Sequence, residues 1–200
     1  MGLSWSTWAS TLEPVENISL ERFAGRWYQV AALPAWFQSP DARDVVATYA
    51  LAADGVGFAM RNEETRADGT HVSIDARAEL DPACRDDGAC GRLLVVFSPS
   101  RAFPSVSAKP APYWVIQLAD DYRYAVVSEP RRRFLWVLSR TPTLADADYT
   151  RIVALLSGSQ GFTPEMLAGL VRTHHTAAIA TPPPPAKATA SVKGEYRVRA

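Results

Sequence analysis

The chain has 200 residues, which is enough for one domain with a sizeable core and short terminal extensions. Lysine plus arginine and aspartate plus glutamate number 21 each, so the formal net charge is zero and excludes the basic footprint of a nucleic-acid binder. Six Trp, seven Tyr and seven Phe suit a β-barrel or β-sandwich, where wide side chains fill the space between strands.

We expect residues 1–17 to form an N-terminal arm that precedes the folded domain. The stretch "MGLSWSTWASTLEPVEN" has neither basic residues nor a long apolar run, so it does not have the pattern of a secretory signal. Gly2 and Ser6 match a short myristoylation pattern of low specificity. Either the protein is made without a signal, or its natural start lies upstream. No apolar run reaches the roughly 18 residues of a transmembrane helix.

Eight strand-like runs follow the arm, and turn signals separate them. Two of the turns carry the same Ala-Asp-Gly sequence, whose glycine adopts the positive φ that tight hairpins need. Several runs alternate apolar and polar side chains, which is typical of a strand with one buried face. The predicted strands are 25–33, 44–52, 56–66, 70–80, 92–98, 112–119, 122–128 and 133–140.

A helix is predicted after the last strand, with Thr143 as its N-cap and Gly158 at its end. Its apolar residues recur at helical spacing and form one stripe, which would pack on the outside of the sheet. The stripe consists of Tyr149, Ile152, Val153 and Leu156. A second short helix is predicted to begin at Thr163-Pro164, a cap followed by a proline in the first turn.

The pattern predicts an all-β fold: an eight-stranded antiparallel up-and-down β-barrel with a C-terminal α-helix packed outside. Eight strands joined by short connections close into a barrel with room for one small ligand. The alternative is a two-sheet sandwich, but a single long connection, 34–43, followed only by hairpins favours the barrel. The barrel and its helices would span 18–176, and the proline-rich residues 177–200 would form a disordered tail.

Two cysteines, Cys84 and Cys90, flank a short polar loop. Their spacing suits either a local disulfide or two free thiols, because sequence fixes neither geometry nor compartment. The three histidines are not at metal-ligand spacing with other ligands, and no nucleophile has a nearby base motif. We therefore expect no metal and no cofactor.

Three segments resemble the signatures of a known family. "FAGRWYQVA" resembles the Gly-x-Trp motif of the lipocalins, "ATYAL" resembles their second strand, and "DDYRYAVVSEP" with "FLWVLSRTP" resembles the end of their barrel. The similarity covers about residues 18–175 and is greatest to the bacterial outer-membrane and apolipoprotein D-like branch. These segments occur in the family's order and at barrel spacing.

The resemblance implies an extracytoplasmic binding protein, not an enzyme, that transports or stores one small hydrophobic ligand such as a fatty acid or lysophospholipid. It also implies a role in envelope maintenance or stress response, in the periplasm or at the outer membrane, with peripheral membrane contact. Members of the bacterial branch usually begin with an acylated cysteine, and this chain has no cysteine before Cys84. A cytoplasmic location therefore stays open. Whether the protein is a monomer or a dimer is open as well.

The resemblance also assigns structural residues. Trp27 would lie across the closed end of the barrel with Arg140 stacked on it, an arrangement that gains cation–π attraction. Gly25 would let the incoming chain bend tightly. Tyr28 and Thr48 would be structural as well.

Ligand contacts are expected from inward-facing side chains, which strand alternation identifies once Trp27 is taken to point inward. On the first strand these are Gln29, Ala31 and Leu33, and on the last strand Trp136 and Leu138. The other strands contribute Tyr49, Phe58, Met60, Ile74, Phe97 and Tyr113. For each residue, plain core packing and ligand contact are both open. Small inward residues, namely Ala31, Ala47, Ala76 and Ala125, would leave volume unfilled.

The loop 34–44 would cross the open end. Trp36 and Phe37 are then either a hydrophobic flap over the pocket or an exposed patch for membrane or partner contact. Arg101 and Lys109, in the loop 98–112, and the three arginines of 129–134 are either solvated charges or contacts for an anionic head group or surface. An alternative function, an enzyme on the same barrel, would depend on the interior polar residues Gln29, Tyr49 and Tyr113.

Overall fold

The computed structural model describes residues 12–84, 90–98 and 109–180. Most of the predicted arm and tail (1–11 and 181–200), including Gly2, therefore lies outside the described residues. So do Arg101 and most of the predicted loop 98–112.

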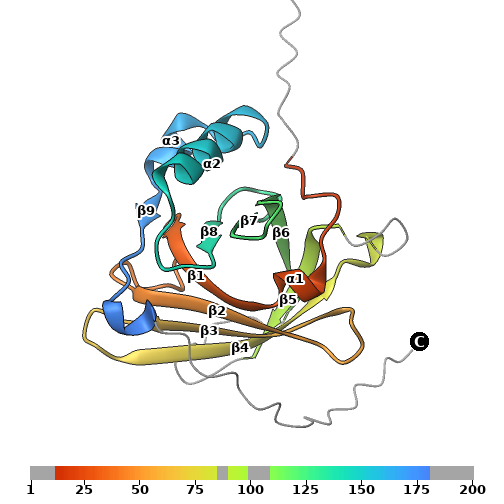
Figure 1. The fold of residues 1–200 in the computed structure, drawn as a ribbon, viewed down its shortest axis with the longest axis horizontal. Coiled ribbons are helices and arrows are strands. Elements are labelled where there is room, and N and C mark those ends of the chain that lie inside the picture. Colours follow the sequence, from red (N-terminus) through yellow and green to blue (C-terminus); the bar gives the residue numbers. More distant parts are fainter. Residues whose placement is uncertain (1–11, 85–89, 99–108, 181–200) are drawn as a thin grey trace, which may run out of the picture.

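One antiparallel sheet closes on itself to form a barrel (Figure 1). Each strand pairs with the next along the chain, and the pairing of β1 with both β2 and β8 closes the ring. All eight predicted strands are present. They are β1 (Gly25–Ala32), β2 (Arg43–Leu51), β3 (Gly57–Thr65), β4 (His71–Leu80), β5 (Arg92–Phe97), β6 (Ala111–Leu118), β7 (Tyr124–Ser128) and β8 (Leu135–Ser139).

The strands alternate up and down, so the connections gather at two ends of the barrel. The closed end carries the short helix α1 (Leu20–Phe23), the β2–β3 turn, and the β4–β5 connection with its 3-10 turn η1 (Pro82–Cys84). The open end carries the β1–β2 loop, the β3–β4 turn and the β7–β8 turn. Gly55 and Gly69, the glycines of the two Ala-Asp-Gly turns, have φ values of 69° and 86°, as these hairpins require.

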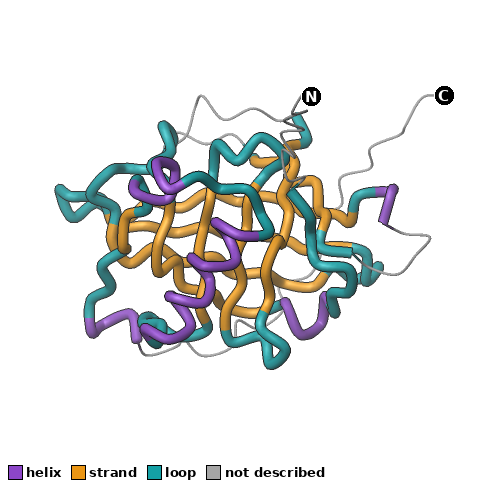
Figure 2. Tube along the Cα trace, turned by 90° about the horizontal axis from the view of Figure 1, so that it is seen from above, coloured by secondary structure: helices purple, strands orange, loops and turns teal. Residues whose placement is uncertain are grey.

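Buried apolar side chains form two clusters, one inside the barrel and one outside it. The inner cluster includes Trp27 and Phe58, and the outer cluster joins β6, β7 and β8 to Ile152 and Leu156 of α2 (Asp146–Gly158). Figure 2 shows the longest helix lying across the outside of the strands. The predicted apolar stripe therefore covers the sheet, and its two most buried residues are Ile152 and Leu156.

The start of α2 differs from the prediction, whereas α3 (Pro164–Ala168) begins as predicted. Thr143 does not cap α2. It lies in a turn that precedes the helix, where its carbonyl accepts hydrogen bonds from the hydroxyls of Thr141 and Ser139. The helix begins three residues later, after Ala145, without a side-chain cap. In α3 the Thr163 hydroxyl accepts from the Met166 backbone amide, and Pro164 occupies the first turn.

A β-bulge in β1 reverses the predicted orientation of two candidate residues. The pairing of β1 with β8 shifts register between Gln29 and Ala31, so Ala31 opposes the outward-facing Val137. Ala31 and Leu33 consequently lie in or against the outer cluster instead of facing the interior. Ala32 takes the inward position, opposite Trp136.

The segment after α3 returns to the barrel and fills the gap where β1 and β2 diverge. The short strand β9 (Val171–Arg172) pairs with the end of β1, and His174 forms a parallel bridge with Arg43 of β2. The Asp44 carboxylate accepts a hydrogen bond from the Thr176 backbone amide at 2.6 Å. Beyond it, the 3-10 turn η2 (Ala177–Ala180) reaches Tyr28, whose hydroxyl donates to the Ile179 carbonyl.

Candidate ligand-binding site

The closed end of the barrel is sealed by Trp27 and Arg140. The Arg140 guanidinium carbon lies 3.7 Å from the Trp27 ring centroid, and the Trp27 indole N–H donates to the Phe23 carbonyl at 2.8 Å. Arg140 also donates to four backbone carbonyls, those of Arg22, Phe23, Arg26 and Tyr122. Burial lowers the pKa of Arg140 to about 10, so the group is still a cation at neutral pH.

Gly25 makes this arrangement possible, because it has a φ of 97° and a Cβ there would lie 3.3 Å from the Arg140 Nη1 atom. Above the guanidinium, aromatic rings fill the bottom of the barrel. The Phe23 ring centroid lies 5.0 Å from that of Trp27 and 5.4 Å from that of Tyr49. Thr48 lies on the opposite face of β2, paired with Arg26 and Arg61.

A tyrosine pair spans the barrel at the level of these rings. The hydroxyl oxygens of Tyr49, from β2, and Tyr113, from β6, lie 2.6 Å apart. Burial raises the pKa of Tyr49 to about 12, and burial together with the neighbouring Tyr49 raises the pKa of Tyr113 well above its ordinary value. Both hydroxyls are therefore neutral near pH 7 and act as a structural crosslink.

Tyr113 nevertheless keeps solvent-accessible surface, and so do several other side chains packed against the inner cluster. In a barrel filled by its own side chains, residues as deep as these would be fully enclosed. The partly exposed residues are Ala47, Phe97, Tyr113 and Trp136, whereas Phe58, Met60, Ile74 and Leu138 are buried. The four partly exposed side chains are therefore the candidates for ligand contact.

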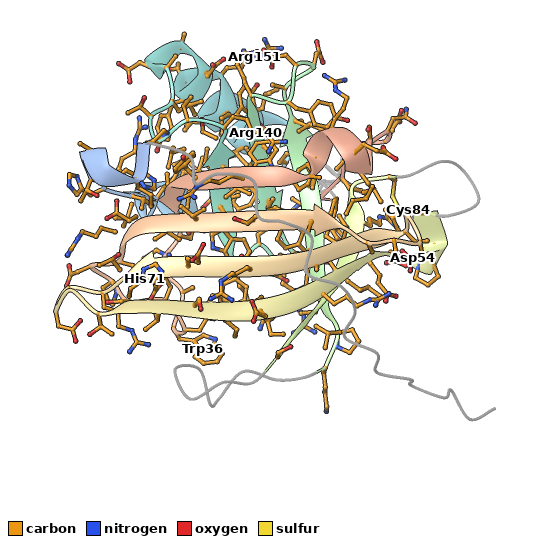
Figure 3. The ribbon with its side chains drawn as sticks, turned by 60° about the horizontal axis from the view of Figure 1, so that its bottom comes forward. Trp36, Asp54, His71, Cys84, Arg140 and Arg151 are labelled. Atoms are coloured by element: carbon orange, nitrogen blue, oxygen red, sulfur yellow. A yellow bond between two sulfur atoms is a disulfide. The ribbon has the colours of Figure 1, made fainter. Side chains whose placement is uncertain are left out.

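The two aromatic residues of the β1–β2 loop have different surroundings. Trp36 is 73% exposed, and its ring touches only the edge of the Phe37 ring among the aromatic contacts of the described residues. Phe37 packs against Phe134 and Trp136, with ring centroids 5.3 and 6.4 Å away. Phe37 thus covers the rim at β8, while Trp36 points toward solvent (Figure 3).

Three interior polar residues of β1 and β3 also line the open half. Gln29 is fully engaged, because its amide donates to the Thr173 hydroxyl and its oxygen accepts from Gln38. Asn62 and Glu64 were not among the predicted site residues, although they alternate with Phe58 and Met60 on β3. Burial raises the pKa of Glu64, an effect that the Ser39 backbone amide and Arg66 partly offset.

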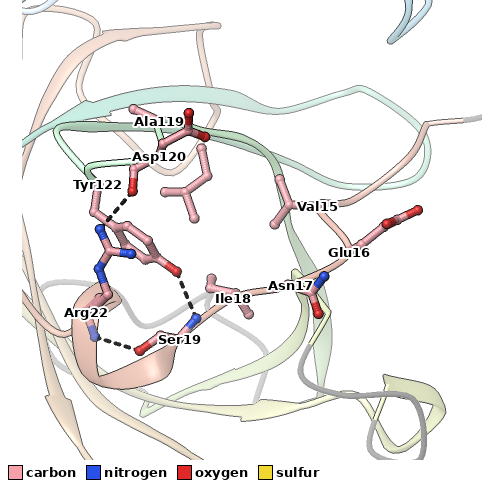
Figure 4. A pocket seen from close by; sticks show the side chains of 10 residues that line it. Val15, Glu16, Asn17, Ile18, Ser19, Arg22, Ala119, Asp120 and Tyr122 are labelled. Carbon is pink, nitrogen blue, oxygen red and sulfur yellow. Dashed lines mark hydrogen bonds between the residues drawn. The ribbon is translucent and has the colours of Figure 1, made fainter.

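A cavity of about 690 Å³ lies at the closed end of the barrel (Figure 4). Residues 15–19 form one wall, and Leu118–Asp120 with Tyr122 form the other. Arg22 bridges the two by donating to the Asp120 carbonyl and stacking 4.0 Å from the Tyr122 ring centroid. The Arg22 side chain is thus engaged within the protein.

The cysteines bond to each other, and the described residues show no cluster of metal ligands. Cys84 and Cys90 form a disulfide at the closed end, near the β2–β3 turn that carries Asp54 (Figure 3). Within residues 12–84, 90–98 and 109–180, no three His, Cys, Asp or Glu residues are grouped so that they could hold a metal ion. Over the same residues, no helix has the length and apolar character to cross a bilayer.

Comparison with known proteins identifies the family. A family model described as a lipocalin-like domain matches residues 18–170. The chain belongs to the lipocalin family. Temperature-induced lipocalin-1 of Arabidopsis thaliana is 34% identical over 71% of this chain and 73% of its own length. Outer membrane lipoprotein Blc of Escherichia coli is 31% identical over 74% of this chain and 76% of its own length. Mouse apolipoprotein D is 29% identical over 72% of this chain and 72% of its own length.

Solved structures agree with the fold of this lipocalin. Insecticyanin from the tobacco hornworm Manduca sexta has a TM-score of 0.66 at 17% identity, over 84% of this chain and 87% of that chain. Lobster apocrustacyanin A1 has a TM-score of 0.59 at 18% identity, over 80% and 81%. Lipocalins as a family bind small hydrophobic molecules and are typically binding proteins rather than enzymes.

Proposed function

We propose that this lipocalin binds one fatty acid or lysophospholipid in the open half of its barrel, above the Tyr49–Tyr113 pair. The observation that carries the proposal is the partial exposure of inward side chains, because Tyr113 and three other residues pack against the inner cluster and still keep accessible surface. A side chain that is deep and still accessible lines an internal space. Phe97, Trp136 and Ala47 surround the same space with apolar surface, which suits an acyl chain.

The names of two relatives support a cellular setting for the proposal. One is an outer membrane lipoprotein and another is a temperature-induced lipocalin. We therefore propose that the protein carries or stores lipid during envelope maintenance or stress, in the periplasm or at the outer membrane. Trp36 supports peripheral membrane contact, because an exposed indole next to a lipid cavity suits the bilayer interface. The proposal holds for a monomer or a dimer.

Titration of delipidated protein with a fluorescent fatty acid tests the proposal. Ala47→Phe would fill the space beside Trp27 and weaken binding by about tenfold or more, because the acyl chain and the new ring compete for one volume. Ala50→Phe is the matched control, since Ala50 lies on the same strand with its side chain exposed outside. The absence of saturable binding by the unmodified protein would remove the proposal.

Native mass spectrometry of the protein purified from its own host identifies the ligand directly. We expect a co-purified adduct with the mass of a fatty acid or lysophospholipid. An adduct of another chemical class would retain the binding site but replace the ligand.

The enzyme alternative has one observation in its favour, the buried carboxyl of Glu64 inside the barrel. A buried carboxyl with a raised pKa is suited to general acid–base catalysis on an apolar substrate. Incubation of the delipidated protein with an epoxide-bearing lipid, followed by mass analysis, tests this alternative. Conversion that Glu64→Gln abolishes would establish the enzyme, and lipid recovered unchanged would dismiss it for this substrate class.

A further inference from the structure

Glu64 points into the barrel from the open end of β3. The pairing of β3 with β4 runs without a register shift from Gly57 to Thr65. Phe58 and Met60 belong to the inner cluster, so strict alternation places Glu64 on the same face. Its outward-facing neighbour, Glu63, instead approaches Arg61 and His71 on the outer surface.

The Glu64 carboxylate is enclosed but incompletely bonded. Its side chain retains 9% of its accessible surface, and the Oε1 atom is buried without a hydrogen-bond partner. The Arg66 Nε atom lies 3.9 Å from Oε1, which is too far for a hydrogen bond. A buried acceptor without a donor is costly in a folded protein, so each such atom needs an explanation.

Asn62 presents a second acceptor of the same kind. Its Oδ1 atom is also buried without a partner, and it lies two residues before Glu64 on the same face of β3. Side chains at this spacing on one strand are about 7 Å apart, within reach of a single head group. The other inward polar side chains are engaged, since Gln29 bonds to Thr173 and Tyr49 bonds to Tyr113.

The remaining unpaired buried atoms of the described residues belong to side chains outside the barrel interior. Arg26 and Arg92 lie on outward positions of their strands, next to the inward Trp27 and Leu93. Gln117 faces α2, where its amide donates to the Ile152 carbonyl. His175 packs on the outer face of β1 against Tyr28. Within the described residues, unpaired acceptors inside the barrel are therefore confined to Asn62 and Glu64.

We propose that Glu64, with Asn62, recognises the polar end of the bound lipid, and that this end is a hydrogen-bond donor such as an ammonium or hydroxyl group. The inference rests on the proposed lipid-binding function and narrows its ligand class. A donor supplies the hydrogen bonds that both oxygens lack, and an ammonium also pairs with the carboxylate charge. A free fatty acid carboxylate would place a second negative charge beside Glu64. An aminated or hydroxylated lysolipid therefore fits better than a fatty acid.

Competition for a fluorescent lipid probe by tetradecylamine, 1-tetradecanol and tetradecanoic acid tests the inference, because the three molecules share a chain and differ in their polar end. We expect the delipidated protein to bind the amine and the alcohol at least about tenfold more tightly than the acid at neutral pH. Glu64→Gln should bring the amine and the acid to within about threefold of each other.

Glu63→Gln is the matched control, because it removes the same charge from the outer face of the same strand, and it should leave the order of affinities unchanged. Equal or tighter binding of the acid by the unmodified protein would overturn the inference. So would a preference of Glu64→Gln for the amine over the acid that is as large as that of the unmodified protein. Those outcomes leave lipid binding itself intact. Failure of all three molecules and of the probe to bind would instead overturn the proposed function.

Discussion

The two ends of the barrel are built from the same strands but from different kinds of side chain. At the closed end, Phe23, Trp27 and Phe58 are completely buried, and Arg140 ties four carbonyls to the indole ring. In the open half, side chains such as Phe97 and Trp136 keep accessible surface, and the Oε1 atom of Glu64 lacks a hydrogen-bond partner. Side-chain packing is therefore complete at the closed end and incomplete in the open half.

This difference separates stability from binding along the barrel axis. An unfilled interior costs stability, because side chains that line a void lose their van der Waals contacts. The dense aromatic packing at the closed end offsets that cost. Mutations at the closed end should therefore change the free energy of unfolding, and mutations in the open half should change affinity. Four predictions test this separation.

The largest expected effect is that of Trp27→Ala. Removal of a fully buried indole leaves a cavity at the bottom of the barrel, which should lower the free energy of unfolding by about 3 to 5 kcal/mol. Urea denaturation measures the loss. The folded fraction should still bind the lipid probe, so intact stability with abolished binding would show that Trp27 serves the ligand instead.

Arg140→Ala should follow, with a loss of about 3 kcal/mol, because buried carbonyls lose a charged donor and Trp27 loses its stacked cation. The matched control is Arg151→Ala on the exposed surface of α2, which should change stability by less than about 0.5 kcal/mol. Equal effects of the two variants in urea denaturation would contradict the closed-end assignment.

The Tyr49–Tyr113 pair, at the boundary between the two halves, should make stability depend on alkaline pH. The pKa of Tyr49 rises from about 10 in the unfolded chain to about 12 in the folded protein, so its contribution is present below pH 10. Between pH 10 and pH 12 the free energy of unfolding should fall by roughly 2 kcal/mol as the unfolded state ionises first. Replacement of both tyrosines by phenylalanine should flatten this decline, and an equally steep decline in that variant would assign it to other groups.

The smallest effect on stability is expected from Trp36→Ser at the rim. Because the Trp36 side chain is 73% exposed, the free energy of unfolding should change by less than about 0.5 kcal/mol. Its co-sedimentation with anionic vesicles should decrease if the rim contacts a membrane. A loss of stability comparable to that of Trp27→Ala would erase the contrast between the two ends.

Strand-like runs between turn signals predicted all eight barrel strands, and a cap residue followed by proline predicted the short helix at Thr163. These features depend on local patterns. Alternation failed where the backbone departs from it. The bulge in β1 turned Ala31 and Leu33 outward, and nothing in "YQVAAL" marks the extra residue that the bulge inserts. β9 was missed because two exposed residues carry no alternation, and their pairing depends on the gap between β1 and β2.

The candidate site was predicted less completely than the fold. Parity on β3 already placed Glu64 with Phe58 and Met60, so the signal was present, but a charged residue near a strand end usually reaches solvent. The enclosure of Glu64 depends on Ser39 in the β1–β2 loop, and that loop's path is a tertiary property. Likewise, the opposite exposures of Trp36 and Phe37 depend on Phe134 and Trp136, almost one hundred positions away in the chain.

The contact between Arg140 and β1 affects how the protein folds during synthesis. The hydrogen bond from Arg140 to the Arg26 carbonyl joins residues 114 positions apart, and β9 joins β1 from still further along the chain. Contacts of such long separation slow folding, because most of the chain must be ordered before they form. During synthesis, β1 leaves the ribosome long before its partners β8 and β9 and spends that interval with one edge open. The strand that closes the ring, β8, is therefore the last of the eight barrel strands to be translated.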